Sequence, residues 1–313
     1  MSIVNKIIGR INVYLNQWAS KTVWFNSTMQ FEGCKAIRTI SSFNNEIANL
    51  GSSSGFYAFN YDAVGVKGIN LAIPRQSLLA DKEILRNYFS YLKEGAVVLI
   101  PLCLFSSLEG EECYFPDCYY MLLQSESIPN YSWKRKLFVQ RIYNNPFKFF
   151  PLYSLAYELL RPLKPKKKFL SEEQMEADAK RWIRDWKSEF CITDFNRPLS
   201  LVNKDSFESA LNLLKEIIEF CHNRHLKPVI IFPPISKQLS EKVDDTMRKL
   251  LITDFVGQIG WAKAPFMNYI DDEEFRDEKM FRNAFFLNED GAVAFTKRVV
   301  ADLKKEGYLS QTI

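Results

Sequence analysis

Five short, mostly apolar runs, each closed by a turn or a helix signal, constrain the fold of this chain more than any other feature. They span residues 47–50, 66–71, 96–100, 227–232 and 266–270. Helical patterns lie between them, for example at 78–92, 207–223 and 241–259. Apolar strands separated by helices are typical of a parallel sheet that is covered on both faces. We therefore expect a three-layer α/β/α domain with a parallel sheet of about five strands.

Length and charge narrow the class of protein further. The 313 residues, 47% of them hydrophobic, suffice for one large domain or two small ones with a full core. A net charge of +4 is too small to indicate a nucleic-acid partner. Apolar runs of about 18 residues, as in a transmembrane helix, do not occur. Polar residues also interrupt the N-terminal apolar residues, which argues against a signal peptide.

The cysteines and histidines give no sign of a metal centre. Six scattered cysteines form no CxxC pair, and the chain has only two histidines. This pattern lacks the ligand spacing of a zinc site and, without an export signal, is typical of reduced thiols in a cytoplasm. We expect a cytoplasmic protein, at most peripheral to a membrane, that uses no metal and no other cofactor.

Residues 3–20 have the pattern of an amphipathic helix. One stripe carries the apolar residues Ile3, Ile7, Ile11, Leu15 and Trp18, and Lys6 and Arg10 lie on other faces. One interpretation is a helix packed on the domain or on another protein subunit. The other is a basic helix lying on a membrane surface.

The middle of the chain breaks the strand–helix rhythm. Residues 104–203 are rich in aromatic side chains and predict helices, which we interpret as a helical insertion into a domain spanning 45–313, preceded by a lead-in over 1–44. The basic run at 161–168 is typical of a solvated loop, with a contact to phosphate or acidic polysaccharide as the alternative. Ser171 is the expected N-cap of the helix that follows this run and ends near Phe190.

The serine-rich turn after the first run is the main candidate for chemistry. Gly51 allows a tight turn, and a serine at the start of the next helix has backbone N–H groups that can stabilise an oxyanion. Sites in open parallel sheets lie at the carboxyl ends of the strands. The strand ends supply residues 52–54, 70–72, 101–103 and 232–234. The start of the last helix, with Asn288 as its expected N-cap, can join them.

Four segments carry a resemblance: Leu50-Gly51-Ser52-Ser53-Ser54, Gly68-Ile69-Asn70-Leu71-Ala72, Val98-Leu99-Ile100-Pro101-Leu102-Cys103-Leu104-Phe105-Ser106 and Leu287-Asn288-Glu289-Asp290-Gly291-Ala292. Together they resemble the SGNH (GDSL-type) hydrolase superfamily, in the divergent branch found with bacterial surface-polysaccharide genes. The resemblance covers roughly residues 45–107 and 205–305 and leaves the helical middle unexplained. It implies an SGNH-hydrolase-like α/β/α fold and ester chemistry on a carbohydrate.

The resemblance assigns a role to individual positions. Ser53 matches the nucleophile, and its own N–H and that of Ala72 match the oxyanion donors. The other cleft positions are Ser52, Ser54, Asn70 and Cys103, where Cys103 replaces an asparagine usual in the family and Ser54 a frequent histidine. The catalytic aspartate and histidine positions carry Asn283 and Phe286.

The last two departures remove the base that a serine hydroxyl needs. His222 and His225 precede the strand at 227–232, so a strand length of roughly 16 Å separates them from its carboxyl end. Cys103 as a substitute nucleophile is disfavoured against a buried structural thiol. Acidic residues upstream are a further alternative for the base, although solvated charges are the favoured interpretation: Asp271, Asp272, Glu273, Glu274 and Asp277.

The expectation is therefore an SGNH-like protein tied by resemblance to ester hydrolysis or O-acyl transfer on a bacterial surface glycan, with a degenerate catalytic dyad. The alternative is a non-catalytic glycan-binding or structural partner subunit of a polysaccharide pathway. Its ligand would be a carbohydrate or an acyl ester. Residues 3–20 would make the membrane-surface or protein contact, and no nucleic acid is expected.

Overall fold

The computed structural model describes residues 3–28, 32–110, 115–160, 169–194, 197–260 and 263–310. The chain divides into two compact units. The helical unit comprises Met1–Thr39 and Tyr114–Lys167, and the sheet unit comprises Ile40–Cys113 and Lys168–Ile313. The predicted insertion at 104–203 is thus divided between both units, and the basic run at 161–168 lies outside the described residues.

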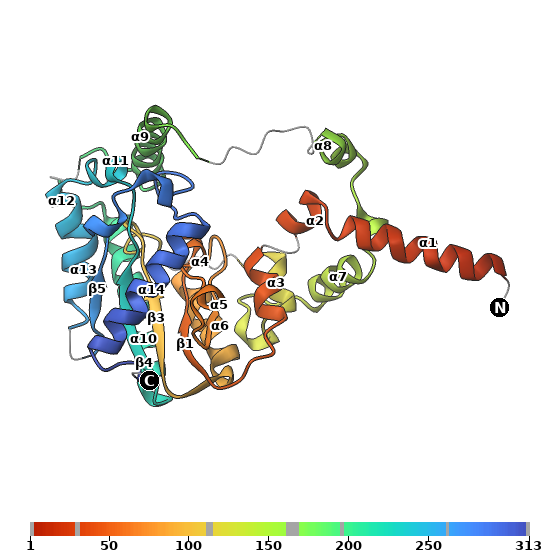
Figure 1. Cartoon of the computed structure of the whole chain (residues 1–313), viewed down its shortest axis with the longest axis horizontal. Coiled ribbons are helices and arrows are strands. Elements are labelled where there is room, and N and C mark those ends of the chain that lie inside the picture. Colours follow the sequence, from red (N-terminus) through yellow and green to blue (C-terminus); the bar gives the residue numbers. More distant parts are fainter. Residues whose placement is uncertain are drawn as a thin grey trace. The chain divides into compact units, whose positions relative to one another are not determined.

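The sheet unit contains the parallel sheet that the sequence predicts (Figure 1). Its strands are β1 (Asn45–Asn49), β2 (Gly68–Asn70), β3 (Leu92–Pro101), β4 (Lys227–Phe232) and β5 (Phe266–Asn268). They run parallel in the order β2-β1-β3-β4-β5. All carboxyl ends therefore meet at one edge. Val97–Ile100 and Val229–Phe232 are almost fully buried, as expected for central strands covered on both sides.

Helices flank this sheet in two groups, which completes the three-layer α/β/α architecture. One group contains α6 (Leu78–Tyr88), α10 (Leu201–Asn223) and α13 (Asp254–Gly257), where Phe207 meets Phe255 with ring centroids 5.2 Å apart. The other group contains α4 (Ser53–Ala58), α5 (Tyr61–Val64) and α14 (Glu289–Lys305).

Two helices begin at the N-cap residues that the sequence predicts, Ser171 and Asn288. Ser171 caps α9 (Glu172–Glu189) with a capping box to Gln174, and the Asn288 side chain accepts the Gly291 N–H at the start of α14. The predicted helix at 241–259 is instead interrupted. It consists of α12 (Asp245–Arg248), the π-helical η7 (Lys249–Thr253) and α13. A short α11 (Lys237–Ser240) precedes them.

The remaining elements of the sheet unit are short 3₁₀ turns at its surface. They are η1 (Phe89–Tyr91), η8 (Glu273–Phe275) and η9 (Glu278–Met280).

The helical unit has a small core of its own. It is built from α1 (Ile3–Ala19), α2 (Val23–Thr28), α3 (Glu32–Arg38), η2 (Asp117–Met121), η3 (Ser125–Ser127), α7 (Trp133–Asn144), η4 (Pro146–Phe149), η5 (Leu152–Ser154) and α8 (Leu155–Leu160). Phe25 is buried and meets Tyr143 with ring centroids 5.4 Å apart. The Val23 N–H donates to Glu158, so both chain segments contribute to the core.

Within the described ranges, no helix is both long and apolar enough to cross a membrane.

Candidate functional site

The serine turn forms where β1 passes into α4. Gly51 adopts a left-handed backbone with φ of +106°, and Ser52 is the N-cap residue of α4. Ser53, the position that matches the nucleophile, is the first residue of this helix and is half-buried. Ser54 is buried, and its hydroxyl has no hydrogen-bond partner among the residues that the structure describes.

Two glycines give this turn its shape for reasons of space. A Cβ at Gly51 would lie 3.2 Å from the Pro101 carbonyl oxygen, in a backbone region that side chains rarely adopt. A Cβ at Gly55 would lie 2.5 Å from the Leu50 carbonyl oxygen. The start of α4 therefore approaches the ends of β1 and β3 more closely than any other residue type permits.

A buried carboxyl group stabilises the turn through a hydrogen bond. The Gly51 N–H donates to Asp81 Oδ1 over 2.7 Å, and the Gln76 side chain donates to the same oxygen. Burial raises the pKa of Asp81 to about 7, although the hydrogen bonds from Gln76 and Gly51 oppose the shift. The sequence reasoning missed this residue. The available signal was its place on the apolar stripe of the predicted helix, between Leu78 and Leu85.

Asn70 lies beside the turn, but its side-chain amide is already engaged inside the protein. Its Oδ1 accepts the Ala72 N–H over 3.0 Å and the Asn49 side-chain amide over 2.9 Å. Its own amide donates to the Phe56 carbonyl over 3.1 Å. The Ala72 N–H is thus already engaged inside the protein, and Ala72 is fully buried.

The loop that carries the dyad positions is organised around an asparagine turn. Asn283 Oδ1 accepts the N–H groups of Phe285 and Phe286 over 3.0 and 2.7 Å. Phe286 packs into an aromatic cluster, with ring centroids 5.5 Å from Tyr57 and 5.6 Å from Trp182. The position that the resemblance matches to a catalytic histidine therefore holds a packing residue, and the position that it matches to an aspartate holds a turn-forming one.

Helix α9 supplies the partners of this loop. Asp178 Oδ2 accepts the Ala284 N–H over 3.0 Å and the Trp182 indole N–H over 3.1 Å. Trp186 is buried and meets Phe285 with centroids 5.0 Å apart. Apart from the i, i+4 spacing of Asp178, Trp182 and Trp186, no feature of the sequence indicates this pairing, because α9 and the loop are far apart in the chain.

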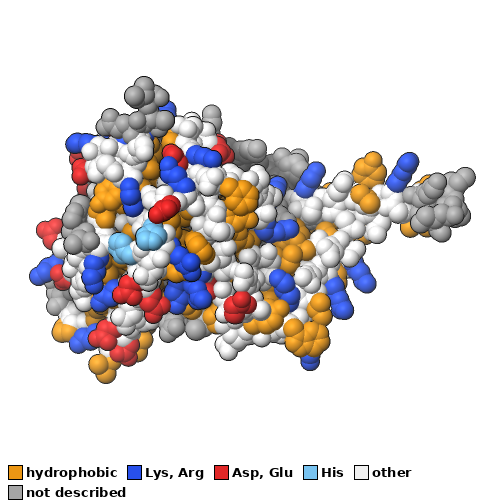
Figure 2. All heavy atoms as spheres, turned by 90° about the horizontal axis from the view of Figure 1, so that it is seen from below, with side chains coloured by type: hydrophobic (Ala, Val, Ile, Leu, Met, Phe, Trp, Pro, Cys, Tyr) orange, Lys and Arg blue, Asp and Glu red, His pale blue; other side chains and the backbone are white. Residues whose placement is uncertain are grey.

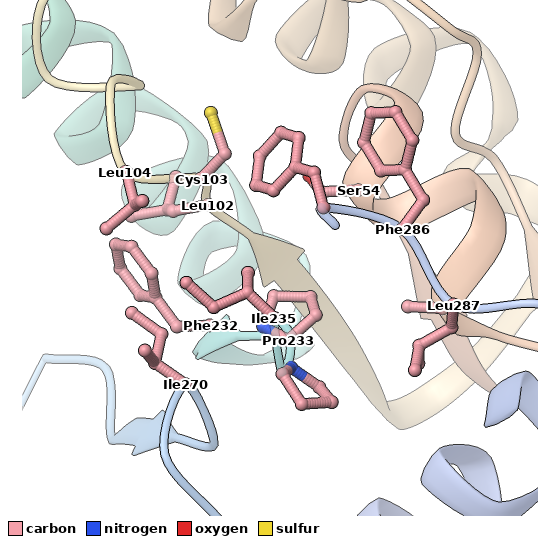
Figure 3. Close-up of a pocket in the computed structure, with 13 residues that line it drawn as sticks. Ser54, Leu102, Cys103, Leu104, Phe232, Pro233, Ile235, Ile270, Phe286 and Leu287 are labelled. Carbon is pink, nitrogen blue, oxygen red and sulfur yellow. The ribbon is translucent and has the colours of Figure 1, made fainter. Parts of the chain in front are cut away.

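The serine turn (Gly51–Gly55) and the aromatic loop (residues 283–287) line one cavity at the carboxyl edge of the sheet (Figure 3). Its other walls are mainly apolar side chains from the ends of β3 and β4: Leu102, Leu104, Phe232, Pro233 and Ile235. The free space is about 10 Å³, which is about the room for one water molecule. Pockets for small molecules are typically about 300–1,000 Å³. The structure thus brings Ser54, Cys103 and Phe286 together around a cavity that side chains fill almost completely.

Cys103 has the character of a structural thiol. Burial, reinforced by the charge of Glu109, raises its pKa to about 12, and the Ser106 hydroxyl donates to its sulfur over 3.3 Å. A thiol of this kind stays protonated at neutral pH and is a poor nucleophile.

The two histidines lie away from this cavity. His222 ends α10, where its Nε2 is 2.6 Å from the Lys263 carbonyl oxygen, and His225 follows three residues later. Both precede β4, whereas Ser53 follows the carboxyl end of β1. Since β1 and β4 are parallel members of one sheet, the histidines and Ser53 lie at opposite edges.

The acidic residues upstream of Asn283 take part in surface ion pairs and turns. Asp271 pairs with Arg248, and Asp272 and Glu274 pair with Arg298. Glu273 pairs with Arg276, and the Asp277 side chain accepts the Lys279 N–H at the start of η9. None of these bonds involves Ser53.

In the described part of the chain, no three or more His, Cys, Asp or Glu side chains are grouped so that they could hold a metal ion. Ester chemistry at Ser53 requires a base and oxyanion donors, whereas Phe286 offers no base and the Ala72 N–H already donates to Asn70. Comparison of the chain with protein-family models and with curated proteins finds no match.

Proposed function

We propose that this chain is a non-catalytic SGNH-like protein that acts as a structural partner in a bacterial surface-glycan pathway. The observation that carries this proposal is the packing of Phe286 against Tyr57 and Trp182, at the position of the catalytic base. The pathway rests on the sequence resemblance alone.

The chemistry of the site supports the absence of turnover. A serine hydroxyl attacks an ester only when a neighbouring group takes its proton, and a phenylalanine ring cannot accept one. Asn283 would be unable to stabilise an imidazolium even if a histidine were present, because its amide is neutral. The hydrogen bonds that Asn283 Oδ1 accepts from the N–H groups of Phe285 and Phe286 also fix the conformation of the loop.

The small free volume of the cavity favours a structural role over glycan binding at this site. A sugar or acyl group needs far more room than about 10 Å³. Opening that room would require the aromatic loop to leave Trp182, Trp186 and Asp178. These contacts support a cleft that stays closed.

Reaction with a fluorophosphonate probe, followed by intact-protein mass, tests this proposal. We expect no adduct on the wild type or on Ser53→Ala. An adduct on the wild type that Ser53→Ala abolishes would overturn the proposal. The double variant Asn283→Asp with Phe286→His serves as the positive arm, because it restores the residue types that the dyad requires and should label above the wild type if the serine turn is otherwise intact.

A thermal shift experiment separates the glycan-binding alternative. A ligand that binds the folded protein raises its melting temperature by mass action. We expect no shift with acetylated or free oligosaccharides. A shift that survives Ser53→Ala would favour a glycan-binding protein over a structural partner.

A further inference from the structure

The helical unit carries a charge quite different from that of the rest of the chain. Its two segments contain fourteen Lys and Arg against four Asp and Glu, a net charge of +10, whereas the sheet unit carries −6. The small net charge of the whole chain conceals this asymmetry. The described basic side chains of the helical unit are Arg10, Lys21, Lys35, Arg38, Lys134, Arg135, Lys136, Arg141 and Lys148.

Helix α1 combines this charge with an exposed apolar stripe. Ile7, Ile11 and Tyr14 lie on one face and are 52%, 52% and 70% exposed. Arg10 lies on a flanking face, and α1 contains no acidic residue. Figure 2 shows hydrophobic side chains next to Lys or Arg along this helix. From Ile7 onward, the covered side chains lie in its last turn, where Trp18 meets Phe150 with ring centroids 5.0 Å apart.

A second exposed apolar group lies in η5 and α8 of the same unit. Leu152 and Tyr153 are both 83% exposed, and Leu159 and Leu160 are 67% and 55% exposed. Soluble proteins rarely place so many large apolar side chains in water on consecutive elements, and such surfaces mark interaction sites.

We propose that the helical unit docks on an anionic lipid bilayer, with α1 and the η5–α8 group as the apolar contacts. Exposed aliphatic and aromatic side chains beside Lys and Arg are the combination that inserts into the headgroup region of such a surface. No described helix could span the bilayer, so the contact is peripheral. This proposal is independent of the proposed function, because it uses none of the residues of the cavity.

Two other occupants fit the same surface less well. A second copy of this unit would bring two surfaces of net charge +10 together, which repels. Nucleic acid would match the charge but would leave the aliphatic side chains Ile7, Ile8 and Leu152 without a partner.

Vesicle sedimentation of the full-length chain tests the proposal. We compare vesicles of phosphatidylcholine mixed with phosphatidylglycerol against phosphatidylcholine alone, at low and high salt. We expect binding to the mixed vesicles, weakened by salt, and little binding to phosphatidylcholine alone.

Substitutions on α1 locate the contact. Ile7→Asn combined with Ile11→Asn and Tyr14→Asn should weaken partitioning by about tenfold or more, and Arg10→Gln by about fivefold. Val13→Asn is the matched control, because Val13 is 55% exposed on the same helix but off the apolar stripe; its effect should stay below about twofold. All these side chains are exposed, so the fold is retained. Leu152→Ser with Tyr153→Ser tests the second group in the same way.

Three results would overturn the proposal. One is equal binding to the two kinds of vesicle. Another is a Val13→Asn effect as large as that of the triple variant. The third is no binding to the mixed vesicles. Concentration-dependent self-association or retention of a duplex oligonucleotide would then identify the other occupant.

Discussion

The serine turn and the aromatic loop border the same cavity, yet they differ in what holds them. The turn at Gly51–Gly55 is fixed by close backbone approach and by the buried Asp81. The loop at 283–287 is fixed by side chains that α9 contributes. The difference shows that backbone contacts and one buried carboxyl group suffice to shape the turn, whereas the facing loop depends on side chains from a helix far away in the chain.

The largest expected effect follows from the removal of an aromatic side chain that packs against the loop. Trp186→Ala should lower the free energy of unfolding by about 3–5 kcal/mol, because it empties a buried site between Phe105 and Phe285. Denaturant unfolding measures the change. The control Leu201→Ala, in a side chain 77% exposed, should change it by less than about 0.5 kcal/mol. Equal effects would mean that the cluster contributes nothing to stability.

On the turn side, stability should depend on the protonation of Asp81. Its pKa rises from 3.8 to about 7 on folding, so the folded protein keeps a proton that the unfolded chain releases. The contribution is complete below pH 3.8 and is lost as pH rises to about 7, by up to about 4 kcal/mol. Denaturant unfolding measured across this pH range should show that the free energy of unfolding of the wild type falls relative to that of Asp81→Asn. Parallel curves for the two proteins would contradict it.

Gly55→Ala tests the close approach in the turn. The new Cβ meets the Leu50 carbonyl oxygen, which belongs to the backbone and can yield only by moving the strand end. We expect a loss of about 2 kcal/mol in the free energy of unfolding. Gly257→Ala is the matched control, because nothing lies within 4 Å of its Cβ position, and it should gain about 0.5 kcal/mol. A neutral Gly55→Ala would mean that the turn tolerates a shift.

The smallest expected effect concerns the link between α9 and the loop. Asp178→Ala leaves the Ala284 N–H and the Trp182 indole N–H without their acceptor and should cost about 1 kcal/mol. A change in tryptophan fluorescence should accompany the loss. Asp185→Ala, on the same helix with a more exposed carboxylate, should change stability by less than about 0.5 kcal/mol. Unchanged fluorescence in Asp178→Ala would separate the aspartate from the tryptophan cluster.

The sequence predicts the sheet well because its signals are local. Each strand is a short apolar run closed by glycine, proline or a polar turn, and all five appear within a few residues of the expected positions. The N-caps Ser171 and Asn288 are correct for the same reason. The single helix expected at 241–259 fails because periodicity does not distinguish a continuous helix from segments joined by a π-helical turn.

The candidate site is less predictable, because its character depends on contacts between distant segments. The residue types at Asn283 and Phe286 are evident in the sequence, but the packing of α9 against the loop that lines the cavity is not. Asp81 shows the same limit. Its position on an apolar stripe could be read, but the Gly51 N–H that it accepts belongs to a turn 30 residues earlier.

The helical unit is assembled from two stretches of chain with three strands of the sheet between them. Residues 1–39 are synthesised before the sheet strands, but Phe25 and Val23 find Tyr143 and Glu158 only after β1, β2 and β3 have followed. Until then the amphipathic N-terminal segment is an incomplete half-core, open to chaperones or to a nearby surface. Cutting the chain before β1 would therefore not remove a domain but would expose the other half of one.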